Sequence, residues 1–357
     1  MKPNTQKAIY LGAASFILSV LSSLTLIIGS KWYFVAFFIF ILFFAAACAC
    51  AGLFALTSLV SPSKIYVLIV PAAAACAGLI CTSVSAAVLS LTPFAAGAVI
   101  AVAAKRRSGK TGAIVVSDLC VGVVLIASFA VSYYAANKTL APSAVVGSIK
   151  DVFSQIEAEM ASVFENVGLY ALYAKIYDLS DMTKETFSSE LAREVMFTVK
   201  AISPAVIITC LNIFSYVATA FFSLSCRVSK TELAIPDGKW RLFPSAISAW
   251  IYLGSMLAYV FMNTFSRLSD SAVLETLYYA ALNLMIILLA PMLICGVRGI
   301  VGRFRSPMHR RSATILTVLC AVLLFFNLFY GLAFAALEGA WDIINLNRLK
   351  KSGNRQE

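Results

Sequence analysis

Three asparagines lie deep inside long apolar segments of the C-terminal half: Asn212, Asn283 and Asn327. Counted along a helix from the predicted outer end of each segment, all three fall at a depth of roughly 15 Å. Ser255 falls near the same level, and Tyr216 shares a helix face with Asn212. Amides and hydroxyls in hydrocarbon need hydrogen-bond partners. These five residues are candidates either for hydrogen bonds that hold a bundle together or for a substrate-binding cavity that opens outward.

Asp118 is an ionisable residue inside another apolar segment. Acids within the membrane are functional candidates, because an ionised group at mid-bilayer costs at least about 2.5–3.5 kcal/mol. Asp118 lies about 12 Å along a helix from Lys110. One interpretation is an acid at the membrane interface beside a basic loop. The other is a role linked to the movement of protons or cations.

Patterns typical of enzymes and metal sites are weak. Ser108–Thr111 reads Ser-Gly-Lys-Thr, like the end of a phosphate-binding loop, but the first glycine of that motif is replaced by Ala104 and an apolar helix precedes it. We interpret it as a basic turn. The nine cysteines have no metal-ligand spacing, and the single histidine, His309, is remote from them. We therefore predict no catalytic residues, no metal ligands and no cofactor, since the paired acids or Ser/His pairs of an intramembrane enzyme are missing from the sequence.

These residues must be positioned by long apolar helices. Apolar residues make up 61% of the chain and charged residues 13%, whereas soluble domains average about 45–50% and about 25%. A helix needs roughly 20 apolar residues to cross a membrane. The segments with this character are Ala8–Gly29, Tyr33–Leu59, Ile65–Leu91, Pro93–Ala104, Ala113–Ala136, Ala201–Cys226, Phe243–Phe265, Leu274–Ile300 and Ser312–Leu337. The predicted fold class is all-α, a polytopic transmembrane bundle of eight or nine crossings with a small extracytoplasmic amphipathic helical insert.

The interval 65–104 leaves the number of crossings open. It has breaks at Thr82-Ser83 and at Thr92-Pro93, residues that favour turns and helix starts. It is therefore either two crossings or one crossing plus a half-helix. Two crossings agree better with the distribution of positive charge.

Lys and Arg concentrate in the cytoplasmic loops of membrane proteins, and this chain has a net charge of +11. With a cytoplasmic N-terminus and two crossings in 65–104, the basic loops Lys105–Lys110, 227–241 and Arg298–Arg311 all face the cytoplasm. The same count leaves the basic tail after Arg348 outside, against the rule, unless one segment does not cross fully.

The interval 137–200 is the one long polar stretch, with nine acidic and six basic residues. Apolar residues at three- and four-residue spacing predict an amphipathic helix over Ile149–Val163 and a second over Phe187–Val195. The predicted domains are an N-terminal transmembrane bundle (1–136), the extracytoplasmic insert (137–200), a C-terminal transmembrane bundle (201–337) and a polar tail (338–357).

A resemblance to a known family rests on several helix ends in the C-terminal half: Lys200-Ala-Ile-Ser-Pro204, Trp240-Arg-Leu-Phe-Pro244, Asn283 to Pro291 with Gly296-Val-Arg298-Gly299, and Leu337-Glu-Gly339-Ala-Trp-Asp342. Together they resemble the YybS-like family of bacterial multi-pass membrane proteins, a domain of unknown function. The first half is similar in hydropathy to the substrate-binding subunits of energy-coupling-factor transporters. Those subunits meet their partner through A-x-x-x-A spacing, and the nearest match is Ala8-Ile-Tyr-Leu-Gly12. The resemblance implies a bacterial cytoplasmic membrane and supplies no catalytic residues.

The leading functional hypothesis is an integral membrane subunit that binds or transports a small solute without its own ATPase. Its expected partners are the lipid bilayer and either other membrane subunits or an energising ATPase module, with no nucleic acid, because the positive charge follows the pattern of cytoplasmic loops. The alternative is a non-transporting scaffold or regulator in envelope assembly.

The predicted topology is testable by single-cysteine labelling in a cysteine-free background. Cysteines in the loops Lys105–Lys110 and Arg298–Arg311 should be protected from an impermeant thiol reagent in intact cells and should react in inside-out vesicles. A cysteine at Thr139, in the insert, serves as the external control. Labelling of both loops from outside intact cells would contradict the orientation.

Overall fold

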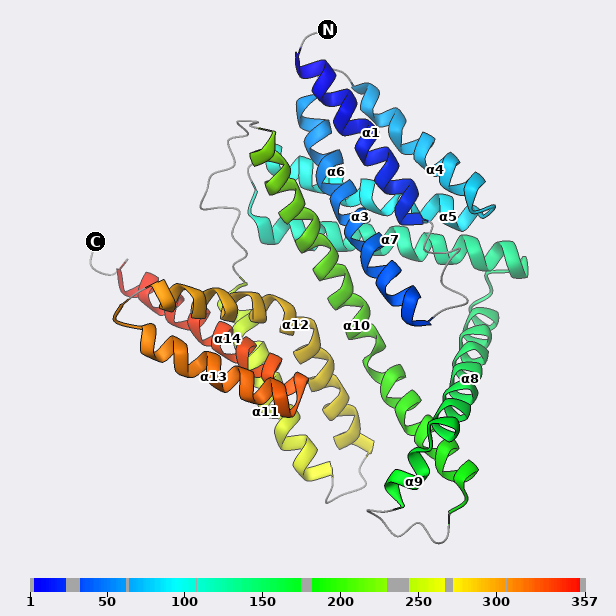
Figure 1. Cartoon of the computed structure of the whole chain (residues 1–357), viewed down its shortest axis with the longest axis vertical. Coiled ribbons are helices and arrows are strands. Elements are labelled where there is room, and N and C mark those ends of the chain that lie inside the picture. Colours follow the sequence, from blue (N-terminus) through cyan, green and yellow to red (C-terminus); the bar gives the residue numbers. More distant parts are fainter. Residues whose placement is uncertain are drawn as a thin grey trace. The chain divides into compact units, whose positions relative to one another are not determined.

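The computed structural model describes residues 3–23, 33–61, 64–106, 108–174, 182–229, 244–266, 272–305 and 307–353. Within these ranges every regular element is a helix (Figure 1), which confirms the all-α class. The chain divides into two compact units. The first contains Met1–Val131 and Ala205–Glu357, and the second contains Ser132–Pro204. The predicted insert, 137–200, falls within the second unit.

The first half of the chain forms a group of closely packed helices. Their bounds are α1 Pro3–Ser23, α3 Tyr33–Val60, the 3₁₀ helix η1 Lys64–Leu68, α4 Ile69–Ile80, α5 Val84–Leu89, α6 Thr92–Lys105 and α7 Lys110–Asn137. Helix α3 packs between α1 and α6 (Figure 1). Small residues allow the close approach, since a Cβ on Gly97 of α6 would lie only 2.6 Å from the Ala51 carbonyl oxygen of α3.

The interval 65–104 contains one short helix followed by one long apolar stretch. Helix α4 has 12 residues, about 18 Å at 1.5 Å per residue, which is too short for a hydrocarbon core of about 30 Å. The chain then turns at Thr82, whose φ of 48° lies in the left-handed region. Helices α5 and α6 follow as the apolar stretch Val84–Lys105, long enough to span a membrane. Val84–Lys105 is thus the stretch of this interval that is long enough to cross on its own, and α4, which continues η1 from Lys64, is the shorter apolar helix before it.

The second half contains the longest helices. Their bounds are α10 Lys184–Val228, α11 Ala246–Ser266, α12 Ala272–Arg305, α13 Arg310–Phe326 and α14 Leu328–Gly353. Helix α14 packs against α11, α12 and α13. The buried Tyr252 hydroxyl of α11 donates to the Ala333 carbonyl oxygen of α14 at 3.1 Å. The predicted loop 227–241 lies outside the described residues from position 230 onward, as do Trp240 and its neighbours to position 243.

The predicted segment Ser312–Leu337 is two helices, which corrects the expectation of a single segment. Helix α13 ends at Phe326, and Asn327 takes an extended conformation with φ −158° and ψ 118°. Its side-chain Oδ1 accepts a hydrogen bond from the Phe329 N–H at 2.9 Å, so Asn327 caps α14 instead of continuing α13. The two helices fold back along each other (Figure 1, orange and red). Helix α14 also extends through most of the predicted polar tail, 338–357.

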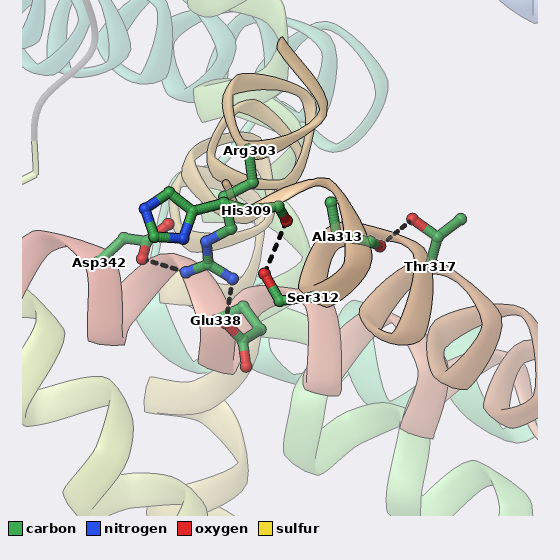
Figure 2. Close-up of polar contacts among 7 residues, drawn as sticks. All are labelled: Arg303, His309, Ser312, Ala313, Thr317, Glu338 and Asp342. Carbon is green, nitrogen blue, oxygen red and sulfur yellow. Dashed lines mark hydrogen bonds and ion pairs between the residues drawn. The ribbon is translucent and has the colours of Figure 1, made fainter. Parts of the chain in front are cut away.

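A cluster of ionic side chains joins the end of α12 to α14 (Figure 2). The Arg303 guanidinium donates to Glu338 Oε2 at 3.1 Å and to Asp342 Oδ1 at 2.5 Å. All three side chains are about one quarter exposed or less, so each charge needs its partner. The cluster places the middle of α14 beside the C-terminal end of α12.

The second unit is built from α8 Pro142–Val167, α9 Leu169–Tyr173 and the part of α10 up to Pro204. Helix α8 covers the predicted amphipathic helix Ile149–Val163, and none of its residues is fully buried. The Lys200 ammonium connects α10 to α8, lying 3.7 Å from Glu157 Oε2 and 5.4 Å from the centre of the Phe153 ring.

Membrane-spanning length is present in several parts of the described chain. Five helical stretches are long and apolar enough to cross a bilayer: Val84–Lys105, Lys110–Asn137, Lys184–Val228, Ala246–Thr264 and Val273–Arg305. Many of their large apolar side chains are exposed. Soluble proteins bury most such side chains, whereas a surface that faces lipid exposes them. The protein is an integral membrane protein.

The packing of α12 on α14 generates a stability prediction. A Cβ on Gly296 would collide with the Ala335 carbonyl oxygen, whereas a Cβ on Gly302 of the same helix meets nothing. We expect Gly296→Ala to lower the free energy of unfolding by about 1–3 kcal/mol, the usual cost of overpacking. Gly302→Ala should be neutral or slightly stabilising, because alanine favours helix. Thermal unfolding in detergent measures both, and equal midpoints would contradict the close crossing.

Candidate functional site

Two cavities lie between the described helices of the first unit. The larger, about 550 Å³, lies between α3, α4 and α6, and Ser58 and Lys105 are the polar exceptions in its apolar wall. The smaller, about 220 Å³, lies between α7, α10 and α12. Its lining residues are Ile114, Asn212, Ile213, Tyr216, Ala290, Pro291, Leu293 and Ile294. An apolar wall with a few convergent polar groups is typical of ligand sites, and only the smaller cavity has polar groups that sequence analysis singled out.

Helix α10 is fastened to both neighbouring walls of the smaller cavity by hydroxyl groups. Ser215 Oγ donates to Ser117 Oγ of α7 at 2.9 Å, and both side chains are fully buried. Thr209 Oγ1 donates to the Ile286 carbonyl oxygen of α12 at 3.1 Å. Such bonds between helices hold membrane bundles together, and here they fix the width of the cavity.

The third wall has a proline where its helix faces the cavity. Pro291 lies inside α12 and has no N–H to donate to the carbonyl four residues earlier. A missing hydrogen bond lets a helix bend, and Pro291 is itself part of the lining. The cavity therefore lies where α12 is least constrained by its own backbone.

Two cations meet Tyr216 at one end of this cavity. The Lys110 ammonium, at the first residue of α7, lies 4.5 Å from the centre of the Tyr216 ring. Arg298 of α12 donates through Nη2 to the Tyr216 hydroxyl at 3.1 Å. The Lys110 side chain is only 5% exposed, so its charge is held largely away from water. The cation–π contact offsets part of that cost, about 0.5–2 kcal/mol.

The predicted polar cluster is divided by the structure. Asn212 and Tyr216 line the same cavity. Asn212 Nδ2 donates within its own helix, to the Ile208 carbonyl oxygen at 2.9 Å. Asn283, Ser255 and Asn327 are not in the lining.

The polar residues outside the cavity form hydrogen bonds with backbone groups that are near them in the sequence. Asn283 Nδ2 donates to the Tyr279 carbonyl oxygen at 2.8 Å and Ser255 Oγ to the Ile251 carbonyl oxygen at 2.7 Å. Asn327 caps α14. The hydroxyls of Thr209, Ser215 and Tyr252, which were not among the predicted site residues, form hydrogen bonds between helices.

Asp118 lies on α7 beside Ser117, and the Ser215 hydroxyl faces its carboxylate. Its Oδ1 atom is buried and has no hydrogen-bond partner among the described residues. Within the same part of the chain, no three His, Cys, Asp or Glu side chains come together in the manner of a metal site. Asp118 therefore belongs to the α7–α10 contact, about two helical turns along α7 from Lys110.

Comparisons of the chain with protein family models, with characterised proteins and with solved structures find no match.

The contact between Ser117 and Ser215 predicts a measurable coupling. Each Ser→Ala change should destabilise the protein, and the double variant should lose less than the sum, with a coupling of about 0.6–1.7 kcal/mol. Ser223→Ala is the matched control on α10, because among the described residues Ser223 bonds within its own helix, to the Thr219 carbonyl oxygen. Unfolding in mixed micelles gives the free energies. Additive losses would contradict a bond between α7 and α10.

Proposed function

We propose that this protein binds a small solute in the cavity between α7, α10 and α12 and acts as the membrane subunit of a carrier without its own ATPase. The observation that carries this proposal is that Asn212 and Tyr216, one turn apart on α10, both line one apolar cavity formed by three candidate membrane spans. Interrupted helices are a recurrent feature of transporter sites, and Pro291 removes one backbone hydrogen bond from the continuous helix α12 at this cavity. The partners proposed for it are other membrane subunits or an energising ATPase module.

The proposed setting is a bacterial cytoplasmic membrane with the N-terminus inside, on the resemblance to the YybS-like family and on the charge of the loops. The α13–α14 hairpin supports this orientation. A single crossing over Ser312–Leu337 would leave the basic tail outside. A hairpin instead returns α14 toward the end of α12, beside Arg303, so Arg348, Lys350 and Lys351 of α14 join the other positive loops. Because both ends are then on the cytoplasmic side, the number of crossings is even, and of the eight or nine crossings predicted we propose eight.

The second candidate function is a non-transporting scaffold or regulator in envelope assembly. The observation that favours it is the apolar side of α8, where Val146, Val152 and Val163 are each more than half exposed. A helix with such a side needs a membrane surface or another protein to cover it. The two candidates differ in whether the cavity between α7, α10 and α12 matters.

Filling that cavity tests the proposal. Ala290 of α12 lines it, whereas Ala280 of the same helix is exposed and is not part of the lining. We expect Ala290→Phe to abolish retention of small molecules that co-purify with the wild-type protein in a neutral detergent, because the new ring occupies the cavity. Ala280→Phe should retain them. Mass spectrometry of the extracted ligands, with size-exclusion profiles as a folding check, makes the comparison.

The same retained molecules in well-folded Ala290→Phe and wild-type protein would contradict a binding cavity and favour the scaffold.

A further inference from the structure

The ligand class of this cavity follows from the charges at its end. Lys110 and Arg298 approach the same tyrosine from two helices, one over the ring and one at the hydroxyl. Two like charges in a partly desolvated place repel each other more strongly than they would in water. An arrangement of this kind is stabilised when an anion enters between them.

The carboxylates close to this end of α12 are already engaged. Arg303 holds both Glu338 and Asp342 in its own ion pairs. Asp118, the acid on α7, lies eight residues from Lys110, about 12 Å along the helix axis. Among the described residues, neither Lys110 nor Arg298 has an ion pair. The positive charge at the end of the cavity is therefore uncompensated by the described part of the chain.

The apolar cavity begins one helical turn from these cations on the two walls that carry them, and Tyr216 of α10 is itself part of the lining. Ile114 follows Lys110 by four residues on α7, and Ile294 precedes Arg298 by four residues on α12. Asn212 precedes Tyr216 by the same interval on α10. Because residues four apart stack on one helix face, the cavity and the cations form one continuous site with an apolar end and a positive end.

We infer that the site takes an amphiphilic anion, with a phosphate or carboxylate group between Lys110 and Arg298 and an apolar portion in the cavity. This inference rests on the proposed function, because it names the ligand class of the same cavity. The shared chemistry has two sources, an anionic phospholipid or a soluble organic anion. Basic pockets between helices near the cytoplasmic surface are suited to both.

The test uses the full chain in a neutral detergent and two matched probes, hexyl phosphate and hexanol, with calorimetry to measure affinity. We expect Lys110→Gln and Arg298→Gln each to weaken hexyl phosphate at least about tenfold, the size expected for loss of a charge-assisted hydrogen bond. Hexanol should bind equally to all variants. Lys110→Arg should keep most of the affinity, and Arg305→Gln, at an exposed arginine of the same helix, should change nothing.

A second arm identifies the source of the anion. Protein reconstituted in vesicles of phosphatidylglycerol and phosphatidylcholine is re-extracted, and the retained lipid is quantified. Selective retention of phosphatidylglycerol that is lost in the Lys110→Gln/Arg298→Gln double variant assigns the site to a lipid. Loss of hexyl phosphate binding without a change in retained lipid assigns it to a soluble anion.

The outcomes separate this inference from the proposed function. If Ala290→Phe removes both probes while the Gln variants leave both affinities and the retained lipid unchanged, the cavity binds ligand and the anion inference is wrong. If Ala290→Phe changes neither probe, the proposed function is wrong as well. Arg298 is exposed, so Arg298→Gln remains informative if Lys110→Gln fails to fold.

Discussion

The close crossing of α12 and α14 is the contact on which the C-terminal half depends. Lipid tails are as apolar as leucine, so helices in a bilayer associate through close packing and hydrogen bonds and gain little from burying apolar surface. Gly296 and Gly339 provide that closeness, because each faces the backbone of the opposite helix. At the end of the same crossing, Arg303 adds two ionic hydrogen bonds to α14. Helix α12 is thereby held firmly along its last turns.

The packing on α14 fixes α12 next to the α12 wall of the candidate site, and α10 connects that wall to α7. Thr209 bonds to the backbone of α12, and Ser215 bonds to Ser117 of α7. These contacts of short hydroxyl side chains set the separation of the three helices. The larger side chains that line the space between the helices do not fill it, so a cavity remains. The positive end of the cavity depends on the same arrangement of helices, since Lys110 and Arg298 reach Tyr216 only when all three helices are in place.

Helix positions were largely predictable from the sequence, because the length of an apolar segment is set by the thickness of the bilayer and not by the helices packed beside it. The segment predicted over Tyr33–Leu59 is α3, Tyr33–Val60. The break at Asn327 was not predictable in this way, since the apolar run continues on both sides and a side-chain cap decides the conformation. In the site, the four-residue spacing of Asn212 and Tyr216 indicated a shared face. Lys110 and Arg298 were assigned to loops by their charge, because their meeting depends on the crossing of separate helices.

The α13–α14 hairpin has a consequence for how the chain is made. Its two arms are joined by Asn327 alone, and basic residues lie at the start of the first arm, at Arg310 and Arg311, and near the end of the second, from Arg348. If the arms enter the bilayer together from the cytoplasmic side, no charged residue has to be translocated, and the polar group that penetrates deepest is already hydrogen-bonded to the next turn. Synthesis of α14 must then precede stable insertion of α13, so truncation after Phe326 would leave α13 without the partner that completes its entry.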